Sequence, residues 1–251
     1  MDPQYAAAHA QQDRAHWWFV GRRAVVLAEM ARRLAGAGLR MVEIGCGSGG
    51  MLEALDQFGS ALGVESDPVL SGRARERDLG VVPGALPDDL PIEASCWDAV
   101  CLFDVLEHVD DEAASLRACR RLLAPGGRLF VTVPAYAWLW SRHDDLLGHR
   151  RRYTTGSLRR AAEAAGLAVE RLTYFNMLLA IPIMMVRLAR AVLGRPEHDL
   201  ERPGRLVNRI LAGCFGAEAR LLRWTNLPFG ISILLVARAA DGEPSRRTSS
   251  A

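Results

Sequence analysis

The sequence contains no lysine, so all 31 of its cationic side chains are arginine, against 29 Asp and Glu residues and a net charge of +2. This near-balance argues against a dedicated nucleic-acid-binding protein, which shows a clearly basic face. Only five cysteines are present, without CxxC spacing. The cysteine pattern therefore predicts neither a disulfide framework nor a zinc knuckle.

Long apolar runs are also missing. No stretch approaches the ~20 uninterrupted apolar residues that cross a bilayer, and residues 1–14 lack the basic region and apolar core of a secretion signal. We expect a cytoplasmic protein, with peripheral attachment to the inner face of the membrane left open. Half of the 251 residues are hydrophobic, which is enough to bury the core of one large domain.

Strand and helix patterns alternate from about residue 22 to residue 175, as in a doubly wound α/β sheet. Helices are expected at 22–35, 50–59, 68–78 and 111–124, and from 157 onward. Strands are expected at 39–45, 61–66, 99–103, 127–134 and 229–239, and another strand is expected to end at residue 175. One domain would then cover residues 22–240.

Three segments stand apart from this alternation. Residues 1–21 precede the first expected helix, and residues 241–251 are polar and small enough to predict a disordered tail. Between the last two expected strands lie about 55 residues, far more than an ordinary connection. We expect a helical insertion at residues 176–226.

A glycine-rich turn carries the strongest chemical signal. Gly45, Gly47 and Gly49 follow an apolar strand and open a helix, which lets the backbone turn sharply and lets a ligand lie against bare main chain. Glu65 ends the next strand, 20 residues beyond Gly45, where an acid accepts the hydroxyls of a ribose. The G-x-G-x-G spacing differs from that of phosphate loops and of nicotinamide-binding proteins. The turn predicts a site for an adenosine-type ligand.

These residues closely resemble a known family. Glu43-Ile44-Gly45-Cys46-Gly47-Ser48-Gly49 is similar to the first motif of class I S-adenosylmethionine-dependent methyltransferases. Residues 97–100 with 106–109, and then residues 122–129, resemble its later motifs in order and at normal spacing. The resemblance covers about residues 22–175 and is closest to the group that contains the ubiquinone and menaquinone biosynthesis enzymes. It implies a Rossmann-like α/β fold with a doubly wound, seven-stranded, mostly parallel sheet, and S-adenosylmethionine as cofactor.

The resemblance also implies roles for individual residues. Glu43 would hold the methionine ammonium group through a charge-assisted hydrogen bond, helped by the backbone at Gly45 and Cys46. Glu65 and Ser66 would bind the ribose hydroxyls, and Asp104 would lie near the sulfonium. The family usually places an aspartate before the adenine-contacting residue. Here that stretch reads Gly84-Ala85-Leu86-Pro87, so we expect backbone contacts from Ala85 or Leu86, or a side-chain contact from Asp88.

The spacing of acids and histidine at residues 104–108 bears on metal binding. In the ubiquinone-type enzymes an acid three residues before a Glu-His pair is associated with magnesium, and Asp104, Glu107 and His108 keep that spacing. The same pair is widespread in relatives that use no metal, and histidine is a poor ligand for magnesium. We expect no metal site.

The acceptor loop, residues 134–153, is dense in aromatic, histidine and arginine side chains. It follows a strand at the edge of the sheet where ligands gather. His143 or His149 would act as general base on a hydroxyl, with Asp144 orienting the imidazole. The alternative is that residues 149–152 form a solvated charge run.

Two flanking segments complete the expected site. In many relatives the N-terminal segment covers the cofactor, so residues 1–21 are expected to form a lid. Within residues 176–224, apolar side chains at helical spacing alternate with arginines, which suits an interfacial helix, a cover over an apolar acceptor pocket, or a homodimer face. Pro182 interrupts the most apolar run and favours the cover.

We therefore predict O-methylation of a small-molecule or lipid-linked acceptor, with no nucleic-acid partner. N- or C-methylation, a non-catalytic S-adenosylmethionine-binding subunit and a nicotinamide oxidoreductase are the alternatives.

Overall fold

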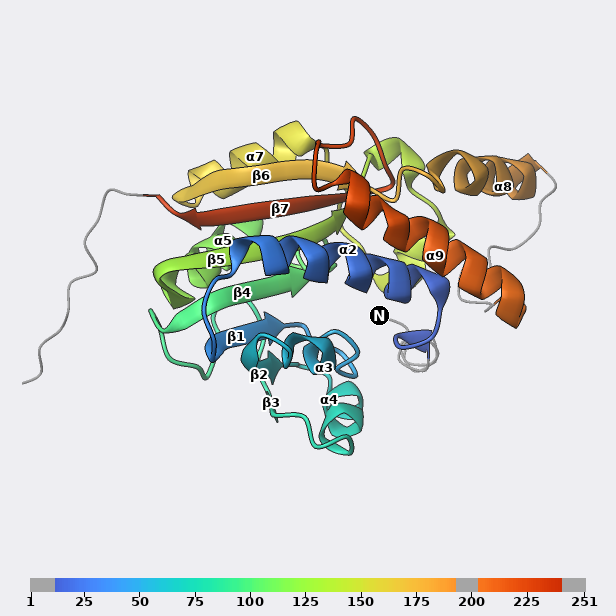
Figure 1. Ribbon diagram of the computed structural model, residues 1–251. Coiled ribbons are helices and arrows are strands. Elements are labelled where there is room, and N and C mark those ends of the chain that lie inside the picture. Colours follow the sequence, from blue (N-terminus) through green and yellow to red (C-terminus); the bar gives the residue numbers. More distant parts are fainter. Residues whose placement is uncertain (1–11, 193–202, 241–251) are drawn as a thin grey trace, which may run out of the picture.

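The computed structural model describes residues 12–192 and 203–240, which fold around a seven-stranded sheet (Figure 1). In sheet order the strands are β3 (Val81–Val82), β2 (Gly59–Val64), β1 (Leu39–Ile44), β4 (Trp97–Phe103), β5 (Leu123–Pro134), β7 (Ser232–Ala239) and β6 (Leu167–Phe175). The first five are parallel, and β7 runs antiparallel to both β5 and β6. The predicted mostly parallel, seven-stranded sheet is confirmed.

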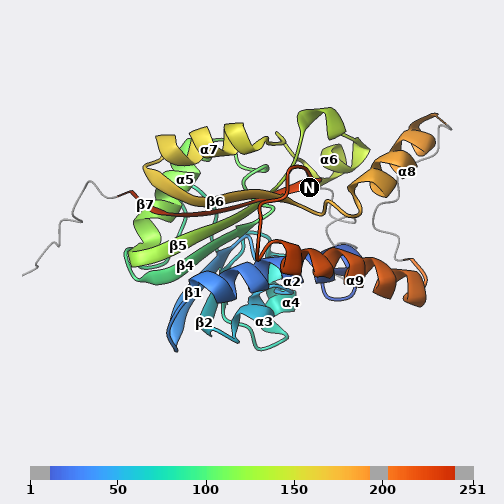
Figure 2. The same cartoon turned by 45° about the horizontal axis from the view of Figure 1, so that its top comes forward.

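Helices cover both faces of the sheet (Figure 2). One face carries α5 (Glu112–Leu122) and α7 (Thr155–Ala164), and the other carries α2 (Trp17–Arg33), α3 (Leu52–Leu55), α4 (Pro68–Arg75) and α9 (Arg205–Leu221). Successive strand residues point to opposite faces. Val42 and Val100 thus pack with the α5 and α7 side, whereas Met41 and Ala99 pack with α2 and α3.

The insertion contains α8 (Ala180–Val192) and α9. Its α9 lies along α2, where Phe215 is fully buried so close to Gly21 that an added Cβ would lie 2.3 Å from the ring. By contrast, α8 projects away from the end of the sheet (Figure 2). Among the described residues, no helix is long and apolar enough to span a bilayer.

Several expected boundaries were wrong. The first helix begins at Trp17, because the His16 side chain accepts a hydrogen bond from the Trp18 N–H at 3.3 Å and caps it, so the aromatic residues 17–19 form its first turn. The expected helix at 50–59 shrinks to four residues, because the chain already enters β2 at Gly59. The two-residue strand β3 was not expected, since so short a strand has no detectable periodicity.

The proposed disordered tail at 241–251 and most of the proposed lid, residues 1–11, lie outside the described residues. The described part of the N-terminal segment reaches the glycine turn, where Asp13 Oδ2 accepts a hydrogen bond from Ser48 Oγ at 2.5 Å. Arg23 strengthens this contact by donating to the Gly50 carbonyl at 3.0 Å.

Candidate active site

A cavity of about 930 Å³ opens at the carboxyl ends of β1, β2 and β4, which is where ligands bind in open α/β sheets. Nine of the predicted site residues line it, namely Glu43, Gly45, Cys46, Gly47, Glu65, Ser66, Asp104, His143 and His149. The fold thus gathers residues from five separate stretches of the sequence around one space.

The glycine turn presents bare backbone to this cavity. Gly45, Gly47 and Gly49 all have positive φ angles, of 73°, 57° and 84°, which side-chain-bearing residues rarely adopt. A Cβ at Gly47 would meet no atom within 4 Å, so the main chain there faces open space. At Gly49 a Cβ would lie 2.4 Å from Leu79 Cδ1, so this glycine is required for packing rather than for lining the cavity.

Glu65 is held in place by backbone donors on both sides. Its Oε2 accepts from the Gly47 N–H and its Oε1 accepts from the Asp67 N–H, each at 2.8 Å. A carboxylate has about four lone-pair sites, so two remain for hydroxyl donors in the cavity. This geometry fits the ribose of an adenosine cofactor.

Glu43 lies at the bottom of the same region and is almost fully buried. Burial raises the pKa of its carboxyl from 4.5 to about 8, although nearby Arg22 opposes the shift. Its Oε2 has no hydrogen-bond partner within the described chain. An orphaned carboxylate oxygen in a cavity wall fits a cationic group such as the ammonium of S-adenosylmethionine.

Asp104 has an unusual backbone conformation directly after β4, with φ of 58°. Such a conformation in a non-glycine residue costs about 1–3 kcal/mol and is concentrated at functional sites. The Asp104 carboxylate pairs with Arg22, whose guanidinium lies 4.8 Å from the Trp18 ring centroid. Arg22 was not singled out from the sequence, because no local pattern links a helix arginine to a strand end 82 residues away.

The predicted adenine contacts are less directly placed. Ala85 and Leu86 are not among the residues that line the cavity. The Ala85 N–H and carbonyl both pair with Asp89, at 2.6 and 3.0 Å, so its main chain is already engaged. Leu86 packs against the core. The adenine contact stays a prediction.

On the acceptor side, the structure pairs Asp144 with His149 rather than leaving the two histidines equivalent. The Asp144 Oδ1 lies 2.8 Å from His149 Nδ1. Arg152 donates to both Asp144 oxygens, at 2.7 and 2.8 Å. Burial alone would raise the pKa of Asp144, but the hydrogen bonds from His149 and Arg152 outweigh it and hold this pKa well below its usual range. Asp144 is therefore an ionised group fixed behind the imidazole.

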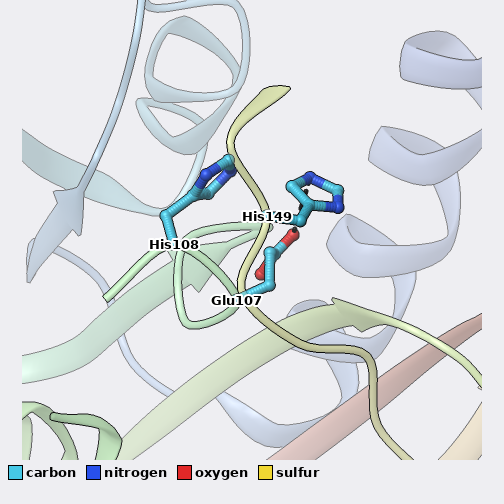
Figure 3. Close-up of side chains that lie close together, drawn as sticks. All are labelled: Glu107, His108 and His149. Carbon is cyan, nitrogen blue, oxygen red and sulfur yellow. Dashed lines mark ion pairs between the residues drawn. The ribbon is translucent and has the colours of Figure 1, made fainter. Parts of the chain in front are cut away.

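Beyond His149 lies Glu107, which is fully buried, with neither carboxyl oxygen hydrogen-bonded to any described residue. Figure 3 shows this carboxyl directed at His149, whose Nε2 is 4.0 Å from Glu107 Oε1. Burial and the charge of Asp104 raise the pKa of Glu107 well above its usual range. A neutral Glu107 leaves no second negative charge beside the imidazole.

His108 completes this group, with its ring centroid 4.7 Å from that of His149 (Figure 3). Burial and His149 together lower the pKa of His108 to about 4, so it is neutral near pH 7. Ligand atoms of Glu107, His108 and His149 lie within 4.8 Å of one another. This group differs from the one that the sequence spacing suggested, which contained Asp104 in place of His149. In the structure Asp104 is paired with Arg22. The expectation of no metal stays a prediction.

The arginine run at 150–152 is only partly solvated, because the Arg150 side chain is half exposed whereas that of Arg152 is buried. Arg150 Nε donates to the His108 carbonyl at 3.0 Å, and Arg151 donates to the Val109 and Asp110 carbonyls at 2.9 and 3.0 Å. These bonds join the acceptor loop to the segment after β4. Sequence reasoning missed this role, because three adjacent arginines give no sign of which residues they contact.

Comparison with known proteins agrees with this geometry. Residues 19–172, more than half of the chain, match the methyltransferase-domain family model. The chain belongs to this family of class I S-adenosylmethionine-dependent methyltransferases. The class and cofactor predicted from the motifs are thereby confirmed.

Relatives by sequence include two ubiquinone biosynthesis O-methyltransferases. The one from Xanthomonas axonopodis pv. citri (strain 306) is 34% identical over 116 residues, covering 43% of this chain and 48% of the relative. The one from Methylococcus capsulatus is 39% identical over 107 residues, covering 39% and 44%. The chain thus matches about half the length of these curated relatives.

Solved structures show the same fold. One belongs to the complex of the Haloferax volcanii Trm112 methyltransferase activator with a methyltransferase, at a TM-score of 0.64, 23% identity and 96% coverage of both chains. Another is Haemonchus contortus phosphoethanolamine N-methyltransferase 2 in complex with S-adenosyl-L-methionine, at a TM-score of 0.58 and 17% identity, covering 87% of this chain and 52% of that one.

Proposed function

We propose that this protein transfers a methyl group from S-adenosylmethionine to a hydroxyl oxygen of an acceptor that has an apolar part. The observation that carries the proposal is that the imidazole of His149, which lines the cavity, is paired with buried Asp144. The sequence relatives described above are O-methyltransferases, which supports oxygen as the acceptor atom.

In this proposal, different residues of the chain bind the cofactor and remove the proton of the acceptor. S-adenosylmethionine supplies an electrophilic methyl group on a sulfonium. Glu43 binds the cofactor's ammonium and Glu65 its ribose hydroxyls, which together fix the direction of transfer. His149 Nε2 accepts the proton of the acceptor hydroxyl, and ionised Asp144 stabilises the imidazolium that forms.

Arg152 acts as a positioning residue for this base. By donating to both oxygens of Asp144, it keeps that carboxylate charged and fixed, so that His149 Nδ1 carries the proton and Nε2 is the acceptor. Neutral Glu107 and neutral His108 then border a nitrogen that is free to take a proton from the acceptor.

The far wall of the cavity indicates an apolar acceptor. It is built by side chains from the insertion, namely Leu179, Pro182, Ile183, Val186 and Leu211. A small hydroxylated molecule with an apolar substituent, or one carried on a lipid, fits a cavity that is polar at the cofactor end and apolar at the other. In the cell we propose a cytoplasmic location for the protein.

The test is a turnover screen. Purified full-length protein is incubated with S-adenosylmethionine and pooled hydroxylated acceptors, with and without alkyl tails, and S-adenosylhomocysteine formation is followed. Methylated hydroxyls are expected. Transfer only to amines or carbons would overturn the assignment to oxygen. Tight S-adenosylhomocysteine binding without turnover of any pool would instead indicate a non-catalytic cofactor-binding subunit.

The raised pKa of Glu43 predicts a pH-dependent affinity for the cofactor product. Because the pKa of Glu43 is about 8, its buried carboxyl is largely protonated in the ligand-free protein at lower pH. The carboxyl must ionise to bind the ammonium group. S-adenosylhomocysteine affinity should therefore rise with pH towards about 8 and then level off. Calorimetry on wild type and Glu43→Gln measures this, and the variant should bind weakly with no such slope.

The same shift affects stability. Because the folded-state pKa of Glu43 lies above its ordinary value of 4.5, the folded protein retains a proton that the unfolded chain has lost. The free energy of unfolding of the ligand-free protein should thus fall as pH rises from 4.5 to about 8. A wild-type protein whose pH dependence matches that of Glu43→Gln in both measurements would contradict the assignment.

A further inference from the structure

The insertion exposes large apolar side chains on both of its helices. Leu178, in the turn before α8, and Ile181 and Met185, on its first turns, are 42%, 55% and 65% exposed. On the first turns of α9, Leu206, Val207 and Ile210 are also more than half exposed. We call these six residues the outer apolar surface. In Figure 2 the two helices lie at the same end of the molecule and diverge away from the sheet.

This surface adjoins the cavity described above. Leu179, just before α8, and Ile183 and Val186 on the helix line the cavity. Residues 178, 181 and 185 are instead exposed to solvent. Pro182 and Val186 are both exposed and cavity-lining. They therefore mark a place where the apolar wall of the cavity continues onto the outer apolar surface.

Within the described residues of α8 and α9, the exposed charges next to the surface are positive. Arg205 and Arg209 are exposed beside Leu206 and Ile210 on α9. The one acidic residue in α9, Glu218, is fully buried, and α8 contains no acidic residue at all. An exposed apolar face bordered by arginine fits an anionic lipid surface, where each cation adds to the attraction.

We propose that the outer apolar surface docks on an anionic bilayer, so that an amphiphilic acceptor enters the cavity directly from the membrane while its tail remains in the lipid. The acceptor part of this inference rests on the proposed methyl transfer, whereas the docking part does not. A second copy of the chain is a poorer occupant, because it would bring Arg205 and Arg209 towards an identical face without exposed helix acids to pair with them.

Vesicle sedimentation of the full-length protein tests the docking. Binding is expected to vesicles of phosphatidylcholine with phosphatidylglycerol, to fall at least about tenfold with phosphatidylcholine alone, and to weaken in high salt as arginine attraction is screened. Ile181→Asp with Ile210→Asp should abolish binding, and Arg205→Glu with Arg209→Glu should remove the preference for anionic lipid. Val69→Asp, at an equally exposed position on α4, is the matched control and should bind as wild type.

Each variant is first checked for a melting-temperature rise with S-adenosylhomocysteine, which separates lost docking from lost folding. Wild-type protein that ignores anionic vesicles, or an Ile181→Asp with Ile210→Asp variant that still binds them, would overturn the proposal. A dimer in light scattering that these aspartates dissociate, without vesicle binding by the wild type, would identify a second copy as the occupant.

The delivery step has its own measurement. An alkylated phenol embedded in anionic vesicles and a short, water-soluble phenol are compared as acceptors. The aspartate variants should lose transfer to the embedded phenol and keep transfer to the soluble one. Equal loss with both would overturn delivery from the membrane, and vesicle binding without transfer to either phenol would leave docking intact while contradicting the proposed O-methylation.

Discussion

His149→Ala is expected to lower kcat for methyl transfer by about 100- to 10,000-fold, the range that general-base catalysis contributes. The imidazole is the group that the structure places between an ionised aspartate and the cavity. Because His149 is not part of the proposed cofactor contacts, S-adenosylhomocysteine affinity should stay close to that of wild type. Steady-state kinetics with calorimetry separate the two effects.

Two further variants make this test specific. Asp144→Asn should also lower kcat, because the imidazolium that forms loses its charged partner. His143→Ala removes a histidine that lines the same cavity from α6 (Arg142–Leu147), and we expect a smaller loss. If His143→Ala instead abolishes turnover while His149→Ala does not, the base has been assigned to the wrong histidine.

Glu65→Ala should weaken S-adenosylhomocysteine binding by about 1.5–3 kcal/mol, the usual contribution of hydrogen bonds to a charged group, or roughly 10- to 150-fold in Kd. The substitution removes the proposed ribose acceptor and also leaves the Gly47 and Asp67 N–H groups without their partner. Isothermal titration calorimetry gives the change directly.

Glu76→Ala serves as the control for this substitution. Glu76 is an exposed acid at the end of α4, so its loss should change Kd by less than about twofold, in line with the small effects of surface substitutions. A Glu65→Ala protein that binds S-adenosylhomocysteine as tightly as the Glu76→Ala protein would show that the ribose lies elsewhere.

The cofactor half of the site was predictable because its signals are local. A turn that requires positive φ at three positions needs glycine at each of them, and the acid at the end of the next parallel strand must lie beside that turn. Gly45, Gly47 and Glu65 therefore occupy in space the places that their spacing suggested.

The acceptor half was only partly predictable, since its contacts join distant segments. The sequence suggested a histidine with Asp144 but left His143 and His149 equal. Only the folded loop shows that Arg152 reaches Asp144 while Arg150 reaches the backbone of residue 108. The Arg22–Asp104 pair likewise depends on how α2 lies across the end of β4. No period or motif encodes such pairings.

The insertion begins and ends at neighbouring positions of the sheet. The chain leaves the sheet at Phe175 and re-enters it at Ser232, and these two residues are direct cross-strand partners. A segment that begins and ends at paired positions can be lengthened, shortened or exchanged without changing the register of β6 and β7. Glu43, Glu65, Asp144 and His149 all precede it in the chain. Under the proposed roles, exchanging the insertion while keeping the rest of the chain should alter the preferred acceptor without altering cofactor binding.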